Sequence, residues 1–210
     1  MRIVIEHTTS YRYSSIATYS VQSLRLTPAA FEGQQVVNWQ VTCRPDGVIT
    51  PTRDGFGNVM HLMTVEGPHQ DVDIIASGVV DIEDRHGVVR GLVETVPLRV
   101  FLRRTDLTMP GPGILDLLKP IAAGETLPWL HDLMGNIRGQ VEYETGVTDS
   151  QTTAAEALKA GHGVCQDHAH IFISACRAAE VPARYVTGYL LTDGISDETA
   201  HHGWAEAFVE

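Results

Sequence analysis

The first half of the chain alternates apolar and polar positions in short runs that end at turn-forming residues. A period of two residues is typical of β-strands, because successive side chains point to opposite faces of a sheet. Five stretches follow this pattern: 2–13, 23–28, 36–43, 59–66 and 71–84. The segment RDGFGN at 53–58 supplies two glycines between two such runs and therefore predicts a hairpin.

The stretch 36–43 shows how this pattern assigns core residues. Val37, Trp39, Val41 and Cys43 alternate with polar neighbours. We therefore expect these four side chains on one face of a strand, with Cys43 as a packed core thiol.

The pattern changes after MPGPG at 109–113, where turn-forming residues are followed by segments of helical period. Residues 127–141 repeat apolar positions at the spacing of an amphipathic helix, with Pro128 near its start. A shorter helix follows, with Thr153 and Glu156 as a capping box and Gly161 suited to its C-terminal end. The sequence thus predicts an α+β protein with a β-rich, sandwich-like domain at 1–108 and an α+β core at 109–210.

The stretch GHGVCQDHAHIF at 161–172 places Cys165 at the start of a further helix, expected to end around Glu180. Unpaired backbone N–H groups at a helix N-terminus stabilise a thiolate and so favour nucleophilic attack. Cys176 lies three turns further along the same apolar stripe and is expected to be a packing residue. Cys165 is therefore the candidate nucleophile.

Composition narrows the possible partners. Fifteen basic against twenty-six acidic residues give a net charge of −11, which disfavours binding to nucleic acid or to an anionic membrane surface. No apolar run approaches the ~20 residues that span a bilayer, and the N-terminus lacks a secretory pattern, so we expect a cytoplasmic protein. The three cysteines form no disulfide framework, and reduced thiols are expected.

A nucleophilic cysteine needs a base to take its proton, and an imidazole from elsewhere in the chain is the usual partner. His168 lies one turn beyond Cys165 and is expected to point along the helix. His202 lies in HHGWAEAFVE at 201–210, where bulky and small residues alternate as in a strand. Such a strand can lie flat against a helix and present His202 to the thiol, and residues 183–191 predict a neighbouring strand.

Three motifs in this order, GHGVCQDHAHIF, CRAAEVPARYVTGYL and HHGWAEAF, resemble the core motifs of the transglutaminase-like superfamily of cysteine enzymes. The segments HTTSYRY, LRLTP and DGFGN resemble the amino-terminal β domain that precedes this core in a bacterial branch. The resemblance implies a papain-related α+β core with Cys165 as nucleophile and His202 as base, His201 being the alternative base. It implies no cofactor and no metal ion.

The resemblance also implies a third site residue, an aspartate on the strand after the histidine strand. No residue here matches it, because the sequence ends at Glu210 within that motif, and the chain is expected to be C-terminally incomplete. The histidine strand would then have an unpaired edge, which predicts either that it pairs with a second copy in a homodimer or that it is frayed.

Two other interpretations stay open at this point. A metal-binding protein is suggested by four side chains within a short stretch: His162, Cys165, His168 and His170. No second ligand pair accompanies them. A non-catalytic binding module or fragment is the other interpretation. Gln166 and Asp167 are expected to be structural, the acidic residue complementing the helix dipole, and Tyr143 is expected to be a packing residue.

The sequence therefore predicts an acyltransferase or protease that acts on an amide of a protein or peptide, in a glutamine side chain or a peptide bond. Cys165 forms a thioester with the acyl group. His202 takes the thiol proton and later returns one to the leaving amine. The backbone N–H of Cys165 is the expected hydrogen-bond donor to the oxyanion.

Overall fold

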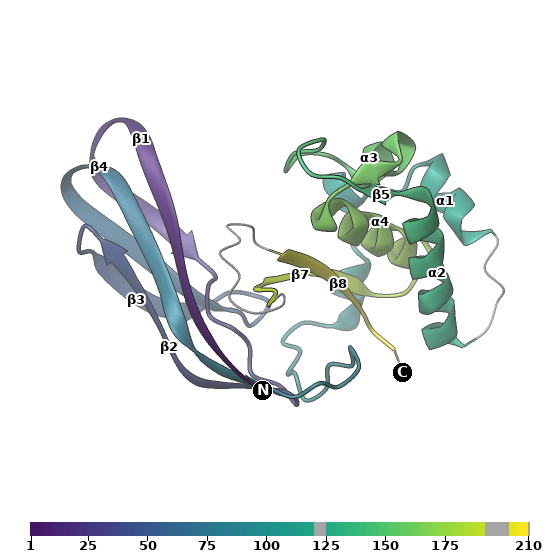
Figure 1. Cartoon of the computed structure of the whole chain (residues 1–210), viewed down its shortest axis with the longest axis horizontal. Helices are drawn as coiled ribbons and strands as arrows, with labels where there is room; N and C mark the ends of the chain where they lie inside the picture. The colour runs from purple at the N-terminus through teal and green to yellow at the C-terminus, as the bar shows by residue number, and fades with distance from the viewer. Residues whose placement is uncertain (120–124, 192–201, 210) are drawn as a thin grey trace. The chain divides into compact units, whose positions relative to one another are not determined.

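The computed structural model describes residues 1–119, 125–191 and 202–209, and the chain divides into two units, Met1–Val96 and Pro97–Glu210 (Figure 1). The first unit is built on one antiparallel sheet in which β4 lies between β1 on one edge and both β2 and β3 on the other. Its strands are β1 (Arg2–Leu24), β2 (Gln34–Arg44), β3 (Val48–Arg53) and β4 (Val59–Ile82).

Two strands predicted separately, at 59–66 and 71–84, are one long strand in the structure, β4, and β1 pairs with it along nearly its whole length. Both strands bend near Gly67, which has a φ of +88°, and the β1–β4 register shifts on either side of Ala17. Val65 and Val72 belong to one buried cluster, although a straight strand would place them about 23 Å apart. Figure 1 shows the ribbon turning over at this bend. The sheet therefore folds onto itself, which gives the predicted sandwich-like core.

Cys43 is one of the residues that close this core. It pairs with Ile74 in the ladder between β2 and β4, and it is buried as predicted. The prediction for Val37 is wrong. The β2–β4 register shifts between Val36 and Asn38, and Val37 is 51% exposed. A bulge adds one residue to one strand and so removes it from the alternation of faces.

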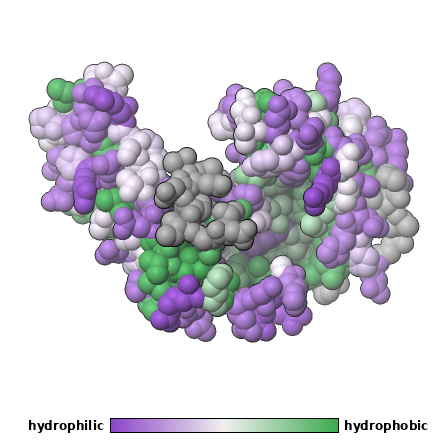
Figure 2. Space-filling model, in the orientation of Figure 1, coloured by the Kyte–Doolittle hydropathy of each residue, from purple (hydrophilic) through white to green (hydrophobic). Residues whose placement is uncertain are grey.

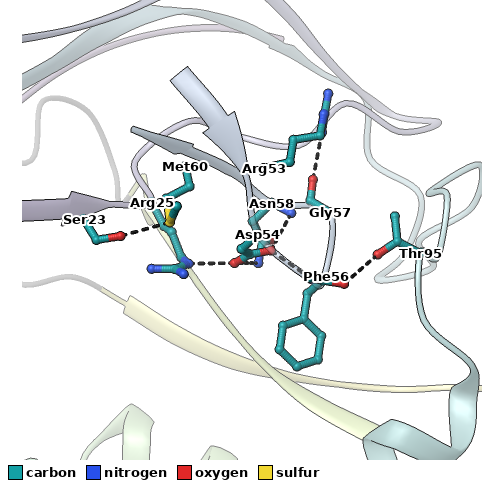
Figure 3. A network of polar contacts seen from close by, with 10 residues as sticks. Ser23, Arg25, Arg53, Asp54, Phe56, Gly57, Asn58, Met60 and Thr95 are labelled. Carbon is teal, nitrogen blue, oxygen red and sulfur yellow. Dashed lines mark hydrogen bonds and ion pairs between the residues drawn. The ribbon is translucent and has the colours of Figure 1, made fainter. Parts of the chain in front are cut away.

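The hairpin predicted at 53–58 is confirmed, because β3 ends at Arg53 and β4 begins at Val59. Asp54 organises this hairpin (Figure 3): its carboxylate accepts hydrogen bonds from the backbone N–H groups of Phe56 and Asn58, at 2.9 and 3.0 Å. Arg25 Nε donates to the same carboxylate at 2.7 Å. These donors, Arg25 foremost, lower the pKa of Asp54 to about 2.

The second unit surrounds one central helix, α4 (Cys165–Ala178), which contacts α1, α2, α3, β7 and β8. Its other elements are the 3₁₀ turns η1 (Leu98–Leu102) and η2 (Asp106–Thr108), the helices α1 (Pro112–Leu118), α2 (Thr126–Gln140) and α3 (Ala154–Ala160), and the strands β5 (Glu142–Tyr143), β6 (His162–Gly163), β7 (Ala183–Gly188) and β8 (His202–Ala207). Two short pairings, β5 with β6 and β7 with β8, flank the helices. Figure 2 shows mostly hydrophilic residues over the outer sides of α2 and α3.

The predicted helix ends are confirmed. The Thr153 hydroxyl accepts a hydrogen bond from Glu156 N–H, and the Glu156 carboxylate accepts one from Thr153 N–H at 3.0 Å. Gly161 ends α3 with a φ of +77°, in the left-handed region where glycine is favoured. The capping box therefore begins α3 and Gly161 ends it, after which the chain continues through β6 into α4.

The chain divides into its two units between Val96 and Pro97, earlier than the boundary predicted between 108 and 109. Arg177 of α4 explains the difference. Its guanidinium donates hydrogen bonds to the carbonyl of Phe101 and to the hydroxyl of Thr108, both at 2.9 Å. The segment 97–108 therefore packs with the second unit. Its 3₁₀ turns give no helical period in the sequence, so periodicity could not assign it.

Among the described residues, α2 and α4 are the longest helices, and no helix of the structure is long and apolar enough to cross a membrane.

Candidate active site

Cys165 is the first residue of α4, directly after Val164, whose backbone is extended. The thiol is partly exposed, whereas Cys43 and Cys176 are buried. Burial raises the pKa of both of these other thiols, that of Cys176 to about 12. Cys165 is therefore the cysteine that can reach a substrate, and it lies at a helix end, where the first backbone N–H groups have no partner within the helix.

Asp167 holds the start of α4 in place. Its side chain is 1% exposed, and its Oδ2 atom accepts hydrogen bonds from Val164 N–H at 2.8 Å and from the Thr148 hydroxyl at 2.7 Å. The sequence predicted an acidic complement to the helix dipole here. It did not predict that the carboxylate is buried and caps the backbone directly before the nucleophile.

The glycine before this turn makes room for the carboxylate. A Cβ atom on Gly163 would lie 2.7 Å from both Cβ and Oδ2 of Asp167, far inside van der Waals contact. Gly163 also pairs with Tyr143 in the short parallel bridge between β5 and β6. Gly163, the second glycine of GHGVCQDHAHIF, is thus needed for the close packing of the chain directly before the nucleophile.

Two of the histidines beside Cys165, His168 and His170, make local contacts, whereas Nδ1 of His162 is buried without a hydrogen-bond partner among the described residues. His168 places Nδ1 3.0 Å from the Val164 carbonyl and Nε2 3.2 Å from the Val141 carbonyl, so its ring points back along the helix as predicted. His170 is buried, and its ring centroid lies 5.4 Å from that of Tyr185. Burial foremost lowers the pKa of His170. Among the residues that the structure describes, no three His, Cys, Asp or Glu side chains converge to hold a metal ion.

His202 is the first residue of β8 and pairs with Gly188 of β7. The small residues of β8 pack on the core around α4, as predicted for a strand lying flat against the helix. His202 alternates with these small residues and therefore lies on the same face of β8 as Trp204. The His202 and Trp204 rings pack edge to face, with their centroids 4.5 Å apart. No hydrogen bond joins Cys165 to His202 within the described ranges. His201, the alternative base, lies outside the described residues.

Tyr185 of β7 packs between α4 and the start of β8. Its ring packs against the core of the second unit, and its hydroxyl lies over Gly203, where a Cβ atom would overlap it. Burial foremost raises the pKa of Tyr185, and the negative charges of Cys165 and Asp167 raise it further. Tyr185 and Gly203 therefore lie against each other at the start of β8, where Gly203 follows His202. No motif in the sequence singles out Tyr185, although the strand alternation of 183–188 places it on the inward face with Ala183.

Comparison with known proteins agrees with this fold and this arrangement of motifs. Residues 3–81 match the bacterial transglutaminase-like N-terminal region, and residues 123–210 match the transglutaminase-like superfamily. An uncharacterized protein of Mycobacterium tuberculosis is 32% identical over 99% of this chain and 73% of its own length. One from Mycobacterium leprae is 28% identical over 99% of this chain and 79% of its own.

A solved structure shares the fold. It is that of a protein from Cytophaga hutchinsonii provisionally assigned as a cysteine protease, with a TM-score of 0.78, 22% identity, and coverage of 100% of this chain and 73% of that one. Fold and family together define a protein of the thiol-dependent enzyme kind. The chain belongs to the transglutaminase-like superfamily, and the resemblance found in its sequence is confirmed.

Proposed function

We propose that this protein transfers or hydrolyses the acyl group of an amide through a thioester on Cys165, with His202 as the base. The observation that carries the proposal is the place of Cys165. It is the partly exposed cysteine at the start of the central helix, with its flanking backbone fixed by Asp167, while the other two thiols are buried.

The chemistry follows from this position. The thiolate of Cys165 attacks the carbonyl carbon of the amide, a carbon–sulfur bond forms, and negative charge moves to the carbonyl oxygen. The carbon–nitrogen bond then breaks, and the amine leaves with the proton that His202 took from the thiol. A second amine or a water molecule attacks the thioester and frees Cys165. The choice between them separates a transferase from a protease.

The proposed role of His202 requires its imidazole to approach the thiol in the substrate complex, because catalytic hydrogen bonds are often long before substrate binds. Trp204 supports this role by packing edge to face against the imidazole, which limits the directions the ring can take. A Cβ atom on Gly188 would lie 3.2 Å from the Trp204 ring, so Gly188 gives that ring its place.

The substrate class we propose is a protein or peptide that offers a glutamine side chain or a peptide bond. Peptide libraries containing either group, incubated with and without a primary amine and analysed by mass spectrometry, test this directly. Acyl transfer to the amine identifies a transferase, and chain cleavage identifies a protease.

Variants then assign the residues. Cys165→Ala and His202→Ala should each abolish turnover, while Cys176→Ala should keep it if the fold is intact. His201→Ala distinguishes the two adjacent histidines. Turnover that survives Cys165→Ala would overturn the proposal, and binding of a peptide without chemistry at Cys165 would favour the non-catalytic binding module.

A further inference from the structure

Tyr185 presents a phenol group next to Gly203, the residue that follows the proposed base His202. The ring is fixed on two sides: it packs against the core around α4, and its centroid lies 5.4 Å from that of His170 at an interplanar angle of 49°. The hydroxyl end extends over Gly203. A fixed ring with a hydroxyl at one end gives that hydroxyl a defined position.

This hydroxyl is available to a ligand. Among the described residues this hydroxyl forms no hydrogen bond, and Tyr185 is partly rather than fully buried. Because burial and the charges of Cys165 and Asp167 raise the pKa of Tyr185, the group stays protonated near neutral pH. It can therefore donate a hydrogen bond to an acceptor next to Cys165.

The backbone N–H of Cys165 is a second donor. Cys165 is the first residue of α4, and a backbone N–H at that position has no partner within the helix. No acceptor for it occurs in the part of the chain that the structure describes. The carbonyl oxygen of an acyl group attacked by Cys165 would lie near this N–H.

We infer that Tyr185 is a further catalytic residue, whose hydroxyl donates a hydrogen bond to the carbonyl oxygen of the acyl group on Cys165. The inference rests on the proposed function, and it adds a side-chain donor to the backbone N–H of Cys165. Donors that are already in place when charge develops on the oxygen stabilise the transition state without reorganising.

Gly203 belongs to this arrangement. The position after His202 carries no side chain, and the Tyr185 hydroxyl occupies the space that a Cβ atom there would need. Gly203→Ala should therefore displace the hydroxyl while Tyr185 itself is retained. Gly203→Ala is therefore a second, independent way to remove the hydrogen bond that the Tyr185 hydroxyl would donate.

The test compares two reactions at the same sulfur. With p-nitrophenyl acetate, the Cys165 thiolate forms a bond to the ester carbonyl carbon, charge passes to the carbonyl oxygen, and the bond to p-nitrophenolate then breaks. With iodoacetamide, the thiolate displaces iodide at a saturated carbon and no oxyanion forms. Both rates are measured for the purified chain, with mass spectrometry to locate the label on Cys165.

Tyr185→Phe removes only the hydroxyl and keeps the ring packing. We expect acylation of Cys165 to fall at least about tenfold while alkylation changes less than about twofold, since loss of one oxyanion donor slows acyl transfer selectively. Gly203→Ala should show the same selective loss. Tyr143→Phe, at a 60% exposed tyrosine on β5, is the matched control and should change neither rate.

Equal acylation rates for the wild-type chain and Tyr185→Phe would overturn the inference and leave the proposed function standing. A parallel fall in both rates would also overturn it, because it would show an effect on the thiol or the fold. Absence of acylation and of selective alkylation at Cys165 in the wild-type chain would overturn the proposed function as well.

Discussion

The carboxylate of Asp167 accepts a hydrogen bond from the backbone N–H of Val164, 2.8 Å away, and so fixes the residue directly before the candidate nucleophile. The same oxygen accepts a second bond from Thr148, in the loop before α3. A buried carboxylate thus joins two loops at the start of the central helix.

Asp167→Ala should lower the free energy of unfolding by about 1–3 kcal/mol, because two partly buried donors, Val164 N–H and the Thr148 hydroxyl, lose their acceptor. Alkylation of Cys165 should slow in the same variant, since the backbone before it is released. Urea denaturation and labelling kinetics measure the two effects. Asp132→Ala, on the exposed side of α2, is the control and should change neither. Unchanged stability in Asp167→Ala would mean that the cap contributes little.

The three cysteines should react in a fixed order. Iodoacetamide near neutral pH should label Cys165 about tenfold or more faster than Cys43 or Cys176, because only thiolates react and burial raises the pKa of the other two thiols. Peptide mapping after short exposure measures the order. In denaturant all three should label alike. Equal labelling of the folded protein would contradict the assignment of the nucleophile.

Gly163→Ala should destabilise the protein by about 1–3 kcal/mol, because the added methyl group meets Asp167 at 2.7 Å in a closely packed turn. Gly135→Ala is the matched change in open space on α2, where nothing lies within 4 Å of the new atom. It should stabilise by about 0.5–1 kcal/mol through helix propensity. Thermal unfolding of both variants measures these changes in stability. If Gly163→Ala is as stable as the wild-type chain, the turn before Cys165 can move to accept the methyl group.

The hairpin around Asp54 should make the stability of the first unit depend on acid. The pKa of Asp54 is lowered to about 2 in the folded chain, foremost by Arg25, from an ordinary value of 3.8. The carboxylate therefore contributes stability above about pH 4, and this contribution is lost as the pH falls toward 2.

Stability measured between pH 2 and 6 should show a smaller acid-induced loss in Asp54→Asn than in the wild-type chain. Asp71→Asn is the control, because Asp71 forms only an exposed ion pair with Arg12 at 3.6 Å. If Asp54→Asn and the wild-type chain lose stability in parallel as the pH falls, the Asp54 carboxylate is not the source of the acid dependence.

The sequence by itself determined the elements whose signals are local. The capping box of Thr153 and Glu156, the positive φ of Gly161 and the hairpin at 53–58 all depend on residues a few positions apart, and the structure confirms each. The start of a helix at Cys165 follows from the same kind of signal. Local hydrogen bonds and backbone preferences act over one turn, so a short stretch of sequence is enough to specify them.

Tertiary structure decided what depends on distant partners. The bend that makes β4 one strand lets Val65 and Val72 share a core, and the alternation on either side of it gives no sign of their contact. Arg177 assigns 97–108 to the second unit through hydrogen bonds to residues far back in the chain. The hydroxyl of Tyr185 reaches Gly203 across a strand pair. Such contacts depend on which surfaces meet when the core closes, and no periodicity within one segment encodes that choice.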